Sequence, residues 1–203
     1  MNYLAHILLA APNLESRLGN FVADFMRGVD REDFSPDIMA GIRMHWKVDQ
    51  YTDAHPIFKQ SRARLPVEHR RFAGILIDIF YDHFLARHWE RFGPGTLAEY
   101  ADQVLGDFMG YDGYLPERAR RVIQRLETDR RFTGYASIDV IDEVLCGISL
   151  RISRANPLCT AVSGLEAAYE ELEQDFLTYF PDLVRYAETL QCPGGIHPAQ
   201  PAP

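Results

Sequence analysis

Residues 75–85 read Ile75-Leu76-Ile77-Asp78-Ile79-Phe80-Tyr81-Asp82-His83-Phe84-Leu85. Apolar side chains fill most positions, so they surround most of the circumference of a helix, which is typical of a helix buried on nearly all sides. The apolar pattern extends over residues 67–92, and Gly93-Pro94-Gly95 ends it. The segment therefore predicts a central buried helix against which the rest of the chain packs.

Helix-start signals on both sides of this segment predict further helices. Ser35-Pro36-Asp37 combines a capping residue, a proline at the first helical position and an acid near the positive end of the helix dipole. A helix from there can run to about Asp53. Thr96-Leu97-Ala98-Glu99 and Ser163-Gly164-Leu165-Glu166 are capping boxes that start two more.

Other helices are predicted over residues 116–130, 137–154 and 163–180, with Pro181 interrupting before a short last helix to about residue 190. Neither a useful strand pattern nor a fixed repeat occurs. We therefore predict an all-α, single-domain helical bundle over residues 1–190. The Pro-rich segment 191–203 is predicted to be a flexible tail.

Composition indicates an ordinary soluble globular protein. The chain has 203 residues, of which 47% are hydrophobic and 25% charged, which suits one domain with a substantial core. The net charge of -8 argues against general nucleic-acid binding. No apolar run reaches the roughly 18 residues that span a membrane, and the start does not resemble a signal peptide. A cytoplasmic location without membrane attachment is expected.

Three cysteines occur, at positions 146, 159 and 192. They are few, widely spaced and odd in number, and no Cys-x-x-Cys pair exists. The sequence therefore predicts neither a disulfide framework nor a thiolate zinc site.

Acids and histidines intrude into apolar segments of the first 88 residues, which hold six of the seven histidines. His6 stands within residues 4–9 and Asp24 within residues 21–25, both otherwise apolar. Burying a single charge costs several kcal/mol, so buried charges are usually paired or bound to metal. The concentration of such residues predicts a metal site in the N-terminal half.

Two groups with four-residue spacing sharpen this prediction. His45, Asp49 and Asp53 share one helix face, and imidazole with carboxylate suits Mn²⁺, Fe²⁺ or Zn²⁺; a solvated face with intrahelical His–Asp contacts is an equal alternative. Asp78 and Asp82 also share a face, and two acids in apolar surroundings repel unless a cation neutralises both. An arginine bridging them is the alternative.

The reaction class follows from what is present and what is not. The chain has no Gly-rich phosphate loop, no Gly-x-Ser-x-Gly and no His-Glu-x-x-His motif. Metal-assisted hydrolysis is therefore the leading class, with the metal polarising a phosphoryl oxygen and activating water. A nearby carboxylate could act as general base.

Several blocks of the N-terminal half resemble the acyl carrier protein phosphodiesterase family. They are Asn2-Tyr3-Leu4-Ala5-His6, Gly19-Asn20-Phe21-Val22-Ala23-Asp24-Phe25-Met26-Arg27-Gly28, Gly41-Ile42-Arg43-Met44-His45 with Asp49 and Thr52-Asp53, and Asp82-His83-Phe84-Leu85 with His88-Trp89. Phe180-Pro181 resembles a late block of the family. The family is similar to the all-helical HD-type phosphohydrolases. The resemblance implies Mn²⁺ as cofactor and release of 4'-phosphopantetheine from holo acyl carrier protein, a step in lipid metabolism.

The resemblance also implies a group of site residues. The His-Asp dipeptide that names the HD group is absent, because Asp82-His83 has the reverse order. On this basis we assign Asp24, Asp78 and His83 to catalysis. We assign four residues to the metal: His6, His45, Asp49 and Asp82.

The implied partner is acidic, which directs attention to arginines. One candidate substrate-binding group is Arg62, Arg64, Arg70 and Arg71. A second is Arg118, Arg120, Arg121 and Arg125. Ordinary solubilising charge is the alternative for both. Two other functions stay open, namely an HD-like hydrolase of a small nucleotide and a non-catalytic helical interaction protein.

Overall fold

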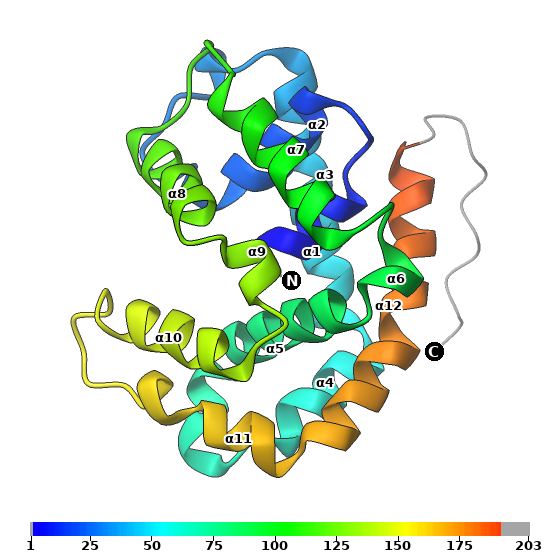
Figure 1. Ribbon diagram of the computed structural model, residues 1–203, viewed down its shortest axis with the longest axis vertical. Coiled ribbons are helices and arrows are strands. Elements are labelled where there is room, and N and C mark those ends of the chain that lie inside the picture. Colours follow the sequence, from blue (N-terminus) through cyan, green and yellow to red (C-terminus); the bar gives the residue numbers. More distant parts are fainter. Residues whose placement is uncertain (1, 192–203) are drawn as a thin grey trace.

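The computed structural model describes residues 2–191, and every regular element in that part of the chain is helical (Figure 1). The α-helices are α1 (Tyr3–Leu9), α2 (Leu14–Val22), α3 (Pro36–Ala54), α4 (Pro56–Arg64), α5 (Ala73–Arg87), α6 (Trp89–Phe92), α7 (Leu97–Met109), α8 (Glu117–Thr128), α9 (Arg131–Gly134), α10 (Ile138–Ser149), α11 (Val162–Ala167) and α12 (Tyr169–Gln191). Short 3-10 helices are η1 (Ala23–Phe25), η2 (Arg31–Asp33), η3 (Val67–Phe72) and η4 (Leu158–Thr160). The predicted all-α class is confirmed, whereas the HD-type arrangement stays a prediction.

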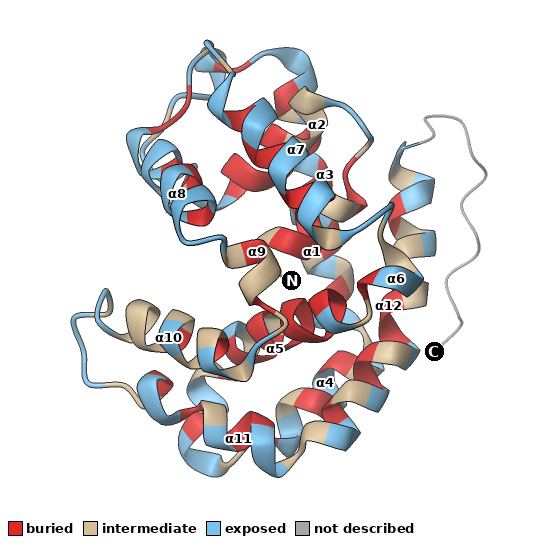
Figure 2. Cartoon of the chain, viewed as in Figure 1, coloured by how far each residue is buried: buried red, intermediate tan, exposed pale blue. Residues whose placement is uncertain are grey.

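Helix α5 lies at the centre of the molecule, as predicted. It contacts α1, α4, α10 and α12, and much of its ribbon is coloured as buried in Figure 2. Leu76, Phe80 and Phe84 are fully buried. The apolar run 67–92 is not one helix, because the backbone leaves helical geometry at Phe72 and again at His88. It is divided among η3, α5 and α6.

Helices α2 and α3 form the tightest pair in the fold. A Cβ on Gly41 would lie 2.6 Å from the carbonyl oxygen of Ser16 and 2.9 Å from the Cα of Gly19. Only glycine permits this approach of two backbones. The close packing brings the end of α2 against the middle of α3, where His45 lies.

The predicted helix starts are partly confirmed. Ser35 caps α3 through the N–H of Ile38, and Thr96 with Glu99 forms the capping box of α7. The second predicted capping box is wrong, because α11 begins at Val162 and the Ser163 hydroxyl donates to the carbonyl of Thr160.

The C-terminal helices also differ from the prediction. The expected helix over 163–180 is broken at Ala168, where the backbone leaves helical geometry. Pro181 does not interrupt the chain but lies inside α12, whose buried side continues across it with Phe180 and Leu183. Gln191 ends α12. The rest of the predicted tail, residues 192–203, lies outside the described residues.

A disulfide joins Cys146 of α10 to Cys159 of η4, which corrects the expectation that the cysteines are unpaired. The two residues are 13 apart in sequence and come together because α10 and η4 pack against each other. Cys192 lies outside the described residues. Within residues 2–191, no helix is both long and apolar enough to cross a bilayer.

Candidate metal centre

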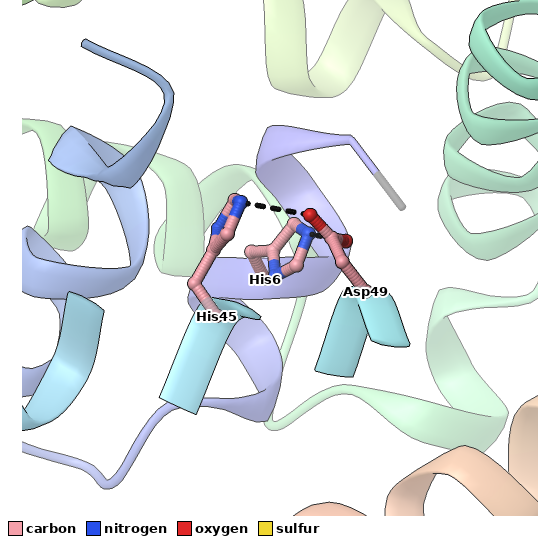
Figure 3. Close-up of side chains that lie close together, drawn as sticks. All are labelled: His6, His45 and Asp49. Carbon is pink, nitrogen blue, oxygen red and sulfur yellow. Dashed lines mark hydrogen bonds and ion pairs between the residues drawn. The ribbon is translucent and has the colours of Figure 1, made fainter. Parts of the chain in front are cut away.

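Three side chains from two helices meet at one point (Figure 3). His6 comes from α1, and His45 and Asp49 come from successive turns of α3. One ligating atom from each lies within 4.8 Å of the other two. The Nε2 atoms of His6 and His45 lie 3.1 Å from Oδ1 and Oδ2 of Asp49, respectively. We call these three residues the His–Asp centre.

The centre is closed on its histidine side and open on its carboxylate side. His6 and His45 are buried, and their rings stack with centroids 3.8 Å apart. The side chain of Asp49 is 41% exposed. Imidazoles fixed in the core and a carboxylate within reach of solvent would leave coordination positions open to water or substrate.

Asp24 adds a fourth donor from η1. Its Oδ1 lies 3.4 Å from the Nε2 of His45, and its side chain is 46% exposed. The expected burial of Asp24 among apolar neighbours is wrong, because Phe21, Val22 and Phe25 turn inward while the carboxylate turns out. Of the predicted site residues, the structure brings His6, His45 and Asp49 together, and Asp24 contacts them through His45.

The backbone of α2 fixes how His45 presents its nitrogens. His45 Nδ1 lies 2.8 Å from the carbonyl oxygen of Asn20, which can only accept, so Nδ1 carries the hydrogen. Nε2 of a neutral ring then directs a lone pair at the carboxylates of Asp24 and Asp49. Only a proton or a metal ion on Nε2 makes this arrangement favourable, and a carbonyl behind a ligating histidine is typical of metal sites.

The pKa values of the centre follow from burial and these contacts. Burial alone would lower the pKa of His45, but hydrogen bonds and charge from Asp24 and Asp49 outweigh it and raise the pKa to about 9. Burial, with the charge of His45, lowers the pKa of His6 to about 4. Burial opposes ionisation of Asp49, yet hydrogen bonds from both histidines hold its pKa well below the usual range. Two carboxylates and two imidazoles are a donor set that fits a divalent cation.

A groove opens beside this centre. It has a volume of about 670 Å³ and includes Asp24 in its lining. Three arginines of α8 and one that lies two residues after the end of α10 form much of its wall: Arg118, Arg121, Arg125 and Arg151. We call it the arginine groove. These arginines give the groove positively charged walls next to Asp24. The sequence directed attention to the arginines of α8 but not to Arg151.

Comparison with known proteins identifies the family. The sequence profile of the acyl carrier protein phosphodiesterase family matches residues 1–183. The chain belongs to this family. Relatives named acyl carrier protein phosphodiesterase are 36% identical in Yersinia pestis (94% of this chain, 100% of the relative) and 36% identical in Escherichia coli (92% and 97%). No solved structure matches the chain.

In this member of the acyl carrier protein phosphodiesterase family, Asp82 lies apart from the His–Asp centre. Its carboxylate accepts the backbone N–H groups of Leu4 at 2.9 Å and Ala5 at 3.2 Å. Burial raises the pKa of Asp82 to about 7, although both hydrogen bonds act in the opposite direction. Asp82 therefore anchors α1, the helix that carries His6, to the central helix α5.

The predicted catalytic residues His83 and Asp78 lie in different surroundings. His83 contacts the Tyr135 carbonyl through Nδ1 and the Tyr169 hydroxyl through Nε2, both at 2.8 Å, so it connects α5 to α12. Asp78 is half-buried; burial raises its pKa, and the negative charge of Asp49 adds to the rise. Asp78 thus lies within electrostatic reach of the centre, and His83 belongs to the packing of the helices.

The first candidate group of arginines does not line the arginine groove; its members are Arg62, Arg64, Arg70 and Arg71. Arg64 binds the carboxylate of Asp175 through Nε at 2.7 Å and Nη2 at 3.1 Å. Arg62 lies 3.9 Å from Asp53, and Asp53 does not belong to the group of ligating side chains that forms the His–Asp centre. In the second group, Arg120 departs from the others, because it donates to the carbonyl of Gly113.

Proposed function

We propose that this chain is a metal-dependent phosphodiesterase that removes 4'-phosphopantetheine from holo acyl carrier protein and leaves apo carrier protein. Relatives named for this activity match more than nine-tenths of the chain. The observation that carries the metal dependence is His45 Nε2, which is directed at the carboxylates of both Asp24 and Asp49 with His6 beside them.

The products define which bond breaks. Apo carrier protein keeps its serine hydroxyl, and free 4'-phosphopantetheine keeps the phosphate. Water therefore attacks phosphorus, the bond from phosphorus to the serine oxygen breaks, and that oxygen receives a proton. A divalent metal held by His6, His45, Asp49 and Asp24 would supply charge to stabilise the phosphoryl oxygens and would make the water more acidic.

The residues of the chain have separate tasks in this proposal. His6 and His45 are buried and cannot reorient, and Asn20 fixes the ring of His45. Asp24 is at the exposed edge, where its second oxygen can accept the proton of the attacking water. Asp82 positions α1, and hence His6, without touching the substrate.

We further propose Mn²⁺ as the metal and the cytoplasm as the place of reaction. A mixed nitrogen and oxygen donor set supports Mn²⁺, Fe²⁺ or Zn²⁺ over Ca²⁺ and Mg²⁺. The family resemblance favours Mn²⁺ among the three.

The decisive experiment uses holo carrier protein and metal-stripped enzyme, with the mass of the carrier as readout. Added Mn²⁺ should produce a carrier that is lighter by the phosphopantetheine arm, and excess chelator should prevent this. Release of the arm at full rate under chelation would remove the metal from the proposal. No loss of mass with any divalent metal would remove the substrate, and guanine nucleotides in parallel would test the nucleotide alternative.

A further inference from the structure

Helix α8 presents one exposed arginine face. Arg118, Arg121 and Arg125 are spaced by three and four residues, so their side chains share one side of the helix. All three line the arginine groove together with Arg151, which follows α10 and is exposed as well. In Figure 1, α8 and α10 face each other across the left side of the molecule.

These charges are largely uncompensated within residues 2–191. Arg121 lies 3.4 Å from Glu117 on the surface of its own helix. The described residues offer no carboxylate within 4 Å of Arg118, Arg125 or Arg151. The acid in the lining of the groove is Asp24, which the proposed function assigns to the metal. Like charges gathered in this way repel one another, so the face favours a negatively charged partner.

The position of the groove restricts what that partner is. The proposed reaction breaks a bond to a serine of the carrier itself. The phosphodiester on that serine must therefore reach the His–Asp centre, and the carrier surface around the serine must lie against the enzyme beside that centre. The arginine groove opens at Asp24, where such a surface has to lie. Apolar side chains also line it, among them Ile75, which is 42% exposed although most residues of α5 are buried. Arginine with scattered apolar groups is a combination typical of protein interfaces.

We propose that the arginine groove is the docking surface for the acidic face of holo acyl carrier protein. The inference rests on the proposed function, and it selects one of two arginine groups. Arg62, Arg64, Arg70 and Arg71 lie outside this groove, and Arg64 is occupied by Asp175. Charge complementarity then steers the acidic carrier to α8 and directs its modified serine toward Asp24.

Two charge-reversed variants with the same change in net charge test the assignment. Arg118→Glu with Arg125→Glu alters the groove, and Arg70→Glu with Arg71→Glu alters exposed residues of η3 as the matched control. All four side chains are exposed, so both variants should fold. Initial rates of arm release are measured in Mn²⁺ against carrier concentration, at low and high salt.

The groove variant should raise KM for holo carrier protein about tenfold at low salt, with a much smaller change in kcat, because it replaces surface attraction with repulsion. The difference from wild type should shrink at high salt as charges are screened. The control should keep the wild-type KM. An unchanged KM in the groove variant, or an equal rise in the control, would overturn the assignment.

A binding measurement separates this inference from the proposed function. Labelled apo carrier protein is titrated with wild-type and variant enzyme, and its fluorescence anisotropy is followed without any hydrolysis. If the wild-type enzyme binds the carrier and the groove variant binds it about tenfold more weakly, the docking assignment is supported even where no phosphopantetheine arm is released. If wild type releases the arm but the two bind equally, docking is wrong and the proposed function stands.

Discussion

At the scale of single residues, Asp24 is both exposed to solvent and in contact with the His–Asp centre. Its carboxylate contacts His45 but its side chain supports little packing. Asp24→Asn should therefore lower turnover by about 10²–10⁴-fold while the free energy of unfolding changes little, because a proton acceptor is lost. Steady-state rates and urea unfolding check both parts.

Asp53→Asn is the matched control, since Asp53 is an exposed acid of α3 that lies 3.9 Å from Arg62. It should turn over at nearly the wild-type rate. Equal losses in both variants would mean that net charge, rather than the position of Asp24, governs the rate.

The proton on His45 predicts how metal affinity depends on pH. Because the pKa of His45 is raised to about 9, the ring is protonated at neutral pH, and a metal must displace that proton. The apparent Kd for Mn²⁺ should fall as pH rises toward 9, by about tenfold per pH unit. Calorimetry at pH 7 in buffers of different ionisation enthalpy should detect about one proton released per metal. Binding without proton release would contradict this account of His45.

At the scale of helices, the contact between α2 and α3 places Asn20 behind His45. Gly41→Ala adds a methyl group against the Ser16 carbonyl and Gly19. The helices must separate, so the variant should lose about 1–3 kcal/mol of stability and bind Mn²⁺ more weakly. Gly106→Ala is the control, because a Cβ added to this exposed glycine of α7 would lie in open space. It should stabilise by about 0.5–1 kcal/mol, and a stabilised Gly41→Ala would refute the close-packing argument.

The anchor between α5 and α1 predicts a pH dependence of stability. Burial raises the pKa of Asp82 from 3.8 to about 7. Between these values the folded chain holds a proton that the unfolded chain has released. This contribution to stability is complete below pH 4 and is lost as pH rises to 7, by at most about 4 kcal/mol.

Asp82→Asn lacks this titration, so the metal-free wild type should lose stability relative to the variant across that pH window. Urea unfolding of both proteins from pH 4.5 to 8 measures the difference. A wild type that instead gains relative to the variant as pH rises would mean that the two N–H groups of α1 stabilise the ionised carboxylate more than burial opposes it.

At the scale of the whole molecule, local patterns account for what the sequence could predict. Helix content follows from periodicity and caps, and the pairing of His45 with Asp49 follows from four-residue spacing within one helix. Contacts between distant segments were not predictable in the same way. Asp78 and Asp82 of α5 resembled a metal site in the sequence, because two neighbouring carboxylates repel each other unless a cation neutralises them. In the structure, the carboxylate of Asp82 instead accepts hydrogen bonds from two backbone N–H groups of α1. The disulfide and the place of Arg151 in the groove likewise depend on how α10 packs.

The bond between Cys146 and Cys159 has a consequence for the molecule after proteolysis. It encloses an exposed segment with Arg151 and Arg154, which is the kind of loop that trypsin cleaves first. A cut there leaves the two fragments covalently joined. Electrophoresis after brief trypsin treatment should show one band of full mass without reductant and two smaller bands with it. Two bands without reductant would mean that the cysteines are unbonded. Because the cut falls after Arg151 or Arg154, every residue that lines the arginine groove stays in the N-terminal fragment, and the disulfide keeps α11 and α12 attached to that fragment.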